Sequence, residues 1–288
     1  MYRVVKYPND RSYGKYFNKV LSFLNDHNEN GDFIHFHWSR WEWMFARDSF
    51  RVEDLDQIVL FEQNERIKGA LIFEDDPDQG FFAVYEDELY LKKFMVDYFN
   101  KHYRHSDIII SRDKEMNDLI KEIGYEKTDW IDPVTKFSLH DLQIPKTKGY
   151  EIVSLEEDYR LDQIHYVLHR GFNHGDLVEY SNKTLEMRRH ETSSPNFKKK
   201  YTYVAIKNNQ YVSYAGLWYI KGTKTALVEP VATVPDHRKK FLARACIYKA
   251  IQAIIDDGAQ DIYVGSNREF YMNMGFESYD FAVRYKRK

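Results

Sequence analysis

The sequence has a single cysteine, no long apolar run and no excess of charge of one sign. One cysteine, Cys246, excludes an intramolecular disulfide and any metal site built from several cysteines. The longest apolar runs, such as QIVLF and ALIF, are far too short to span a bilayer. The first residues, MYRVVKYPND, lack the apolar segment of a signal peptide. We therefore expect a cytoplasmic protein with no membrane partner.

Charge of either sign is nearly balanced. The 42 lysine and arginine residues face 45 aspartate and glutamate residues, which leaves a formal net charge of -3. Nucleic-acid-binding proteins are more often plainly basic, so we expect no nucleic-acid partner. Aromatic residues make up 16% of the chain and apolar residues 43%, which is enough material for a packed core. The length of 288 residues is about right for two domains.

Two segments in the first half of the chain resemble two segments in the second half. Residues 57–76 and 202–221 each read as a strand, a polar turn and a strand. Residues 107–130 and 261–281 each read as a buried strand, a short helix ended by a glycine, and a further strand. Both pairs are separated by roughly 150 residues, which predicts a tandem duplication of one unit.

The predicted fold class is α+β, an α/β/α sandwich in two tandem domains, each a mixed, mostly antiparallel sheet flanked by helices. We place the domains at residues 1–140 and 151–288. The linker at 141–150 contains Pro145 and Gly149, which interrupt any regular pattern. In the second domain we expect helices at about 157–171, 180–191, 238–256 and 268–274, and strands near 202–207, 211–220, 224–234, 261–265 and 277–284.

The stretch VEPVATVPDHRKKFLARACIYKAI, residues 228–251, reads as a strand that enters a helix through a short basic loop. Cations are unfavourable at a helix start because the helix dipole is positive there, yet Arg238, Lys239 and Lys240 occupy this position. Such a junction also points unpaired backbone N–H groups at one spot. The stretch therefore predicts a phosphate or diphosphate site with charge-assisted contacts. The alternative interpretation is a solvated run of charge.

This loop resembles the phosphate loop of the GNAT (GCN5-related) N-acetyltransferases, Arg/Gln-x-x-Gly-x-Gly/Ala. Arg238 and Ala243 match the motif, whereas Phe241 replaces its first glycine. Glycine permits close approach of the backbone to a diphosphate, so we expect Phe241 to weaken CoA affinity or adjust the pose without abolishing binding. The resemblance implies acetyl-CoA as co-substrate and no metal. The cofactor-binding residues that it implies are Val231, Ala232, Thr233, Arg238, Lys239, Lys240, Phe241, Leu242, Ala243, Arg244 and Asn267.

The stretch FYMNMGF, residues 270–276, is similar to the family motif Phe-Tyr-x-x-x-Gly-Phe, whose tyrosine protonates the departing CoA thiolate. The resemblance therefore implies that Tyr271 is the catalytic acid and that Glu229, directly or through water, is the base. Pro230 cannot donate to a sheet ladder, so the strand is expected to bulge or splay there. The freed backbone of residues 231–233 would pair with the pantetheine arm of the coenzyme. The alternatives are a core aromatic for Tyr271 and a structural carboxylate for Glu229.

The first-half counterpart of the basic loop lies within residues 80–99 and carries Glu86, Asp87 and Glu88. Acidic side chains suit a helix start but repel a diphosphate. The Phe-Tyr pair is likewise replaced by Asp118-Leu119. The first domain is therefore predicted to be a degenerate copy with a structural or substrate-shaping role, and the chain resembles two-domain GNAT proteins in which only one half is catalytic.

Other candidate residues have simpler explanations. His35 and His37 could share one face of a strand and bind zinc, but the helical spacing of Trp38, Trp41 and Phe45 favours packing in the core. No metal site is predicted. Cys246 lies on the apolar face of a predicted helix and is expected to be a core residue.

His169, His174 and Asp176 are expected in the loop after the first helix of the second domain, where the resemblance implies a border of the acceptor site. The charged side chains of KKKY, residues 198–201, are expected to be exposed to solvent.

The sequence thus predicts an N-acetyltransferase, a monomer or homodimer, that moves an acetyl group from acetyl-CoA to a primary amine by direct attack. A small-molecule amine is the expected acceptor, although no portable motif identifies it. A non-catalytic acyl-CoA-binding or sensing protein is the main alternative. A nucleic-acid-associated module built on the basic residues 238–244 is a weaker one.

Overall fold

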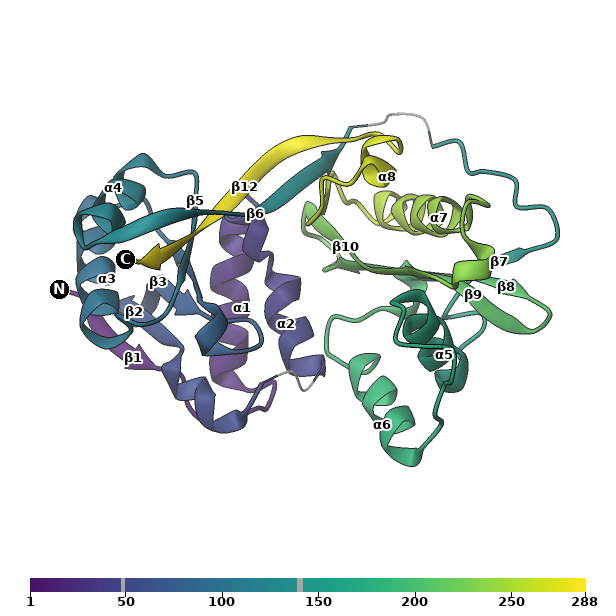
Figure 1. Cartoon of the computed structure of the whole chain (residues 1–288), viewed down its shortest axis with the longest axis horizontal. Helices are drawn as coiled ribbons and strands as arrows, with labels where there is room; N and C mark the ends of the chain where they lie inside the picture. The colour runs from purple at the N-terminus through teal and green to yellow at the C-terminus, as the bar shows by residue number, and fades with distance from the viewer. Residues whose placement is uncertain (48–49, 139–141) are drawn as a thin grey trace. The chain divides into compact units, whose positions relative to one another are not determined.

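The computed structural model describes residues 1–47, 50–138 and 142–288. The chain forms two compact units (Figure 1). Unit 1 comprises Met1–Val134 and Tyr279–Lys288, and unit 2 comprises Thr135–Ser278. Residue 141, where the predicted linker begins, lies outside the described residues, and residues 142–150 form neither helix nor strand. None of the helices in the described ranges is long and apolar enough to cross a membrane.

Unit 1 is a mixed sheet with helices packed against it. Its strands are β1 (Arg3–Lys6), β2 (Val59–Gln63), β3 (Arg66–Ile72), β4 (Phe81–Tyr85), β5 (Ile108–Ser111) and parts of β6 (Tyr125–Phe137) and β12 (Phe276–Arg287). Its helices are α1 (Lys15–Asn28), α2 (Trp38–Arg47), α3 (Leu89–His102) and α4 (Lys114–Glu122). The strand order is β1-β2-β3-β4-β5-β12-β6. The β4–β5 pair is parallel, and the pairs from β1 to β4 are antiparallel.

The last residues of the chain complete the sheet of unit 1. Ala282 to Tyr285 of β12 pair antiparallel with Ser111 to Ile108 of β5. The predicted strand at 277–284 is therefore present, but most of it lies in the first unit. A division of the chain at residues 141–150 does not anticipate this pairing, because local sequence patterns do not encode which distant strand is the partner.

The core of unit 1 is rich in aromatic side chains. Trp38, Trp41 and Phe45 lie on α2 and are fully buried, which confirms the prediction from their helical spacing. His35 and His37 are buried beside them, and burial lowers the pKa of each to about 3, so both are neutral at pH 7. Across residues 1–47, 50–138 and 142–288, no group of three or more His, Cys, Asp or Glu side chains could hold a metal ion.

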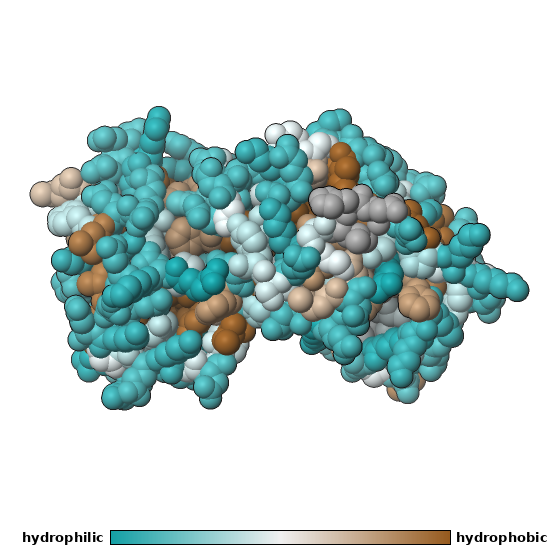
Figure 2. Space-filling model, turned by 90° about the horizontal axis from the view of Figure 1, so that it is seen from above, coloured by the Kyte–Doolittle hydropathy of each residue, from teal (hydrophilic) through white to brown (hydrophobic). Residues whose placement is uncertain are grey.

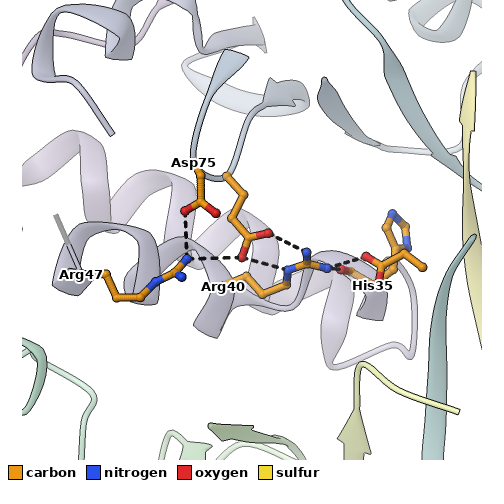
Figure 3. A network of polar contacts seen from close by, with 6 residues as sticks. His35, Arg40, Arg47 and Asp75 are labelled. Atoms are coloured by element: carbon orange, nitrogen blue, oxygen red, sulfur yellow. Dashed lines mark hydrogen bonds and ion pairs between the residues drawn. The ribbon is translucent and has the colours of Figure 1, made fainter. Parts of the chain in front are cut away.

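A partly buried ionic network joins α2 to two other parts of unit 1 (Figure 3). The Arg40 guanidinium lies 2.6 Å from a Glu74 carboxylate oxygen and 2.6 Å from one of Asp132. Arg47 lies about two helical turns further along α2, and its guanidinium nitrogen is 2.9 Å from a carboxylate oxygen of Asp75. Burial opposes these charges, but the attraction of Arg40 lowers the pKa of Glu74 below its usual value. The pair of Arg40 with Glu74 therefore stabilises unit 1 as long as Glu74 is ionised.

Unit 2 has the same kind of architecture. Its strands are residues 135–137 of β6, β7 (Glu151–Ser154), β8 (Thr202–Lys207), β9 (Gln210–Tyr219), β10 (Thr225–Thr233) and β11 (Asp261–Val264). Its helices are α5 (Leu161–Gly171), α6 (Asn182–Glu191), α7 (Leu242–Asp256) and α8 (Glu269–Met272). The strand order is β6-β11-β10-β9-β8-β7, with β10 and β11 parallel and the other neighbours antiparallel.

Helices cover both faces of the sheet of unit 2, with α7 on one side and α5 on the other (Figure 1). Apolar side chains of α7 pack with the strands in one cluster, and those of α5 pack with them in a second. Cys246 of α7 is fully buried, as expected for a core residue, and burial raises the pKa of its thiol to about 12. The predicted α/β/α sandwich with a mixed, mostly antiparallel sheet is confirmed.

The surface seen in Figure 2 is mostly hydrophilic, with hydrophobic residues in small, separate patches. This pattern agrees with the balanced charge of the sequence.

Candidate functional site

The centre of unit 2 is a strand with a break in its hydrogen-bond ladder. The pairing of β10 with β9 shifts register between Val228 and Val231, so the bulge predicted from Pro230 is confirmed. Gly216 lies opposite on β9, where an added Cβ would be 2.9 Å from the backbone oxygen of Glu229. The bulge therefore depends on a glycine across the ladder, because any side chain at residue 216 would push the two strands apart.

Beyond the bulge, no strand in the described part of the chain pairs with β10 on the side of β11. The parallel pairing joins Thr225–Leu227 of β10 to Asp261–Tyr263 of β11. The strand β10 then continues to Thr233, while β11 ends at Val264. The edge of β10 near residues 231–233 is thereby available to an extended ligand, in the way that an added strand would use it.

The loop from β10 to α7 contains two residues with left-handed backbone. Lys239 and Phe241 both have φ of 59°. Residues in this conformation cannot continue a right-handed helix, so α7 begins at Leu242 and not at residue 238 as predicted. The Phe241 side chain is 63% exposed, and its conformation costs about 1 kcal/mol because its Cβ crowds the following carbonyl. Glycine would avoid this cost.

A pocket of about 720 Å³ opens between the end of β10, the start of α7 and the segment around α8. It is lined by Gly171, Phe172, Asn173, Val231, Ala232, Thr233, His237, Arg238, Lys239, Phe241, Leu242, Ala243, Arg244, Arg268, Phe270, Tyr271 and Asn273. Most of the residues predicted to bind the cofactor therefore lie around a single pocket, together with Tyr271. Lys240, Glu229 and Asn267 are not among the lining residues, and the Lys240 ammonium donates to the Asp236 carbonyl at 2.8 Å.

The wall of this pocket is strongly cationic. Arg238, Lys239, Arg244 and Arg268 line it, and within the described residues its lining includes no carboxylate. Leu242 and Ala243, the first residues of α7, also line it, and the first N–H groups of a helix have no partner within the helix. An anionic ligand is therefore favoured both by side-chain charge and by the helix terminus.

Arg238 also ties the loop to the end of α5. Its guanidinium donates to the carbonyl oxygens of Thr233 at 3.1 Å and Gly171 at 2.9 Å, and to the Asn173 side-chain oxygen at 2.8 Å. An added Cβ at Gly171 would lie 2.7 Å from the Cβ of Ala232, so α5 ends in direct contact with β10. Arg238 thus both contributes charge and fixes the shape of the pocket.

Tyr271 lies on α8 with its ring against those of Phe270 and Phe276, at centroid distances of 5.0 and 5.7 Å. Burial raises the pKa of Tyr271 to about 12, the negative charge of Glu229 adds to this shift, and Arg268 opposes it. The phenol is therefore protonated at neutral pH, as a proton donor must be. Glu229 is close enough to Tyr271 for its charge to be felt, although it does not line the pocket.

The histidines near the end of α5 lie beside the pocket but not in its wall. His169 lies 5.8 Å from His165 and 5.7 Å from His174, measured between ring centroids. Asp176 forms an ion pair with Arg170. The sequence did identify His169, His174 and Asp176 as neighbours of a site, but their contact with an acceptor stays a prediction.

Sequence reasoning missed Gly171, Asn173 and Arg268, which come from two separate segments of the pocket wall, the end of α5 and the residue before α8. A signal was present only for Arg268, which is a basic residue between a buried strand and the FYMNMGF motif. Nothing in the local pattern around Gly171 distinguishes it from an ordinary helix end, because its role depends on a contact with β10.

Comparisons with known proteins agree with this geometry. Residues 162–276 match the model of the acetyltransferase (GNAT) family. No curated protein sequence matches the chain.

Among solved structures, the fold is similar to that of a tandem GNAT protein from the clavulanic acid biosynthesis pathway, with a TM-score of 0.61 and 13% identity, over 99% of this chain and 98% of that one. It is similar to a GCN5-related N-acetyltransferase from Sphaerobacter thermophilus, with a TM-score of 0.57 and 10% identity, over 99% and 95% of the two chains. It is also similar to a GNAT acetyltransferase from Colwellia psychrerythraea, with a TM-score of 0.54 and 10% identity, over 80% and 85%.

Unit 2 therefore contains a region, residues 162–276, that matches the acetyltransferase (GNAT) family model. The chain as a whole has the fold of a tandem GNAT protein.

Proposed function

We propose that unit 2 binds acetyl-CoA in the 720 Å³ pocket and transfers the acetyl group to a primary amine. The observation that carries this proposal is the combination, in one GNAT domain, of an open strand edge, a cationic pocket without a lining carboxylate among the described residues, and a protonated tyrosine. CoA has a polyanionic nucleotide end and an amide-rich arm, and these two parts suit the cations and the strand edge respectively.

The coenzyme is held in two places. Its diphosphate lies at the start of α7, where the backbone of residues 242–244 and the side chain of Arg238 lie around one pocket. The pantetheine amides pair with the backbone of residues 231–233 along the open edge of β10. Lys240 and Asn267, which are outside the lining, are proposed to contact the coenzyme from the rim.

The reaction is a direct acyl transfer. The neutral amine attacks the thioester carbonyl carbon to form a C–N bond, and backbone N–H groups near residues 231–233 stabilise the developing oxyanion. Glu229, through a water molecule, takes the proton from the amine. The C–S bond then breaks, and the sulfur receives the Tyr271 phenol proton. The products are the amide and free CoA.

Unit 1 is proposed to have a structural or substrate-shaping role, with functional domains at residues 1–140 and 151–288. A small-molecule amine is the proposed acceptor, and a monomer or homodimer the proposed state.

The test is an assay of CoA thiol release from acetyl-CoA against amino acids, polyamines, aminoglycosides and simple amines. We expect Tyr271→Phe to lower kcat about 100-fold with little change in CoA affinity, since the acid acts on the leaving group and not on binding. Tyr203→Phe is the matched control, because Tyr203 is a partly buried tyrosine that packs against the same core cluster but does not line the pocket. Binding of CoA without thiol release to any amine would instead identify a non-catalytic acyl-CoA-binding protein.

A further inference from the structure

Phe241 is an unusual residue for the wall of an anion-binding pocket. Its side chain is 63% exposed, more than that of Phe172 at 46% or Phe270 at 42%, the other phenylalanines of the lining. It also has the left-handed backbone conformation, with φ of 59° and ψ of 15°, which a large side chain rarely adopts. Neither core packing nor backbone preference accounts for a phenylalanine here.

The surroundings of the ring are those of a nucleotide site. The Arg244 guanidinium carbon lies 5.8 Å from the Phe241 ring centroid, and the same guanidinium donates to the Asn273 carbonyl at 2.6 Å. Phe241 is also the residue immediately before α7, next to the N–H groups that start the helix. An exposed aromatic face thus lies within one side-chain length of both a cation and a helix N-terminus.

We propose that the Phe241 ring is the surface on which the adenine base of the coenzyme stacks. This inference rests on the proposed function. With the diphosphate at the start of α7 and the thioester directed along β10 towards Tyr271, the nucleoside is the part of the coenzyme left to contact the exposed ring of Phe241, the residue immediately before α7. A planar base has a π-face that any aromatic ring can stack against.

Stacking also gives the strained conformation a purpose. Backbone strain at a functional site is retained where the side chain that it presents is needed. The expectation from the sequence was the opposite, namely that a phenylalanine at the glycine position weakens CoA binding. The two interpretations predict changes of opposite sign when Phe241 is replaced by glycine.

The experiment measures the Kd of the full chain, by calorimetry, for CoA and for its two halves, adenosine 3′,5′-bisphosphate and 4′-phosphopantetheine. Phe241→Leu is expected to weaken CoA and the bisphosphate by the same factor, about ten-fold, and to leave phosphopantetheine unchanged. Phe241→Trp, which keeps an aromatic face, is expected to retain wild-type affinity for both. Tyr90→Leu is the matched control, since it removes an aromatic ring of similar exposure, 61%, that does not line this pocket, and it should change none of the three constants.

A second variant distinguishes the loss of base stacking from a general loss of structure. Phe241→Gly should raise the Tm, because glycine tolerates this φ, and at the same time weaken CoA binding, a combination that general loss of structure does not produce. Tighter CoA binding by Phe241→Gly overturns the proposal and supports steric obstruction. Equal affinities of wild type and Phe241→Leu, or an equal loss of affinity in Tyr90→Leu, also overturn it. A wild-type protein that does not bind CoA at all overturns the proposed function itself.

Discussion

The two units share one arrangement of strands and helices but differ in the loop that connects a central strand to the helix after it. In unit 2, residues 234–241 connect β10 to α7, and the junction opens into a pocket. In unit 1, residues 86–88 connect the corresponding strand β4 to α3. The shorter connection leaves no room for a loop whose backbone can surround a diphosphate.

In unit 1 a buried cation lies near the start of α3. Lys92 on α3 is 2% exposed, and its ammonium lies 2.7 Å from Asp113 and 3.0 Å from Glu115, with a further ion pair to Asp87. Burial opposes its charge, but the hydrogen bonds to these carboxylates raise the pKa of Lys92. The local charge is therefore already balanced within the unit.

Unit 1 also lacks a tyrosine at the position that corresponds to Tyr271. Tyr271 is four residues before Gly275, and the residue four before Gly124 is Ile120, which is fully buried. The predicted counterpart of the Phe-Tyr pair, Asp118-Leu119, was therefore one residue out of register, and Leu119-Ile120 takes that position. The comparison shows that the same arrangement of sheet and helices can carry an open cationic pocket, as in unit 2, or a junction whose charges are paired, as in unit 1. The difference lies in the connecting loop, in which sign of charge is left unbalanced, and in one side chain of the last short helix.

The largest difference between the units should be in anion binding. Arg268→Glu is expected to weaken CoA binding about 100-fold, because it replaces a cation of the pocket wall with an anion that repels the coenzyme. Lys92→Met in unit 1 should leave the Kd for CoA unchanged while lowering stability, since Lys92 is already paired. Calorimetry on both variants tests this, and a large effect of Lys92→Met on CoA affinity would show that unit 1 also takes part in binding.

The next largest effect should be on the stability of unit 1. Glu74→Gln is expected to lower the free energy of unfolding at pH 7 by about 2 kcal/mol, because it leaves the partly buried Arg40 with Asp132 as its remaining carboxylate partner in this network. The pKa of Glu74 is lowered in the folded state, so its contribution is present above the pKa of an unfolded glutamate and is lost as pH falls through the folded pKa.

Urea unfolding at pH 7 and below about pH 4 measures this dependence. The difference between wild type and Glu74→Gln should shrink at the lower pH, and the exposed Glu65→Gln should show no such difference. The Kd for CoA should not change in Glu74→Gln. A difference that grows on acidification would contradict the assignment of the ion pair.

A smaller contrast is expected between two glycines at similar places in the two sheets. An added Cβ at Gly216 meets the Glu229 backbone oxygen at 2.9 Å, whereas at Gly69 it meets the sulfur of Met95 at 2.5 Å. Because a methionine side chain moves aside and a backbone does not, Gly216→Ala should cost about 2 kcal/mol and Gly69→Ala less than that. Only Gly216→Ala should raise the KM for acetyl-CoA, since it displaces the bulge of β10. Equal effects on KM would argue against a role of the bulge.

The smallest expected effect is that of pH on kcat, which should be nearly absent in the usual assay range. The pKa of Tyr271 is raised to about 12, so the phenol keeps its proton throughout the usual assay range. The kcat of the wild type should therefore not fall between about pH 7 and 10 through ionisation of an acid with this pKa. Assays of kcat across this pH range test the prediction. A fall in kcat below pH 10 that is present in the wild type but absent from Tyr271→Phe would mean that the pKa of Tyr271 is lower than about 12.

Much of unit 2 was predictable because its signals are local. The strands at 202–207 and near 211–220 agree with β8 and β9 within a residue, since alternation of apolar and polar residues is visible in any short window. The bulge followed from Pro230, and the buried position of Cys246 from helical spacing. The start of α7 was placed too early because nothing in the sequence announces left-handed backbone at Lys239 and Phe241.

The sequence by itself determined the duplicated pattern, the fold class and the basic loop with its tyrosine motif, because periodicity and charge are properties of neighbouring residues. Tertiary structure alone decided that β12 completes the sheet of unit 1, that Lys92 balances three carboxylates, and that Arg268 and Gly171 share a pocket wall. Each of these depends on contacts between residues far apart in the chain. Such contacts are selected by packing of the whole domain, which leaves no trace in a local window.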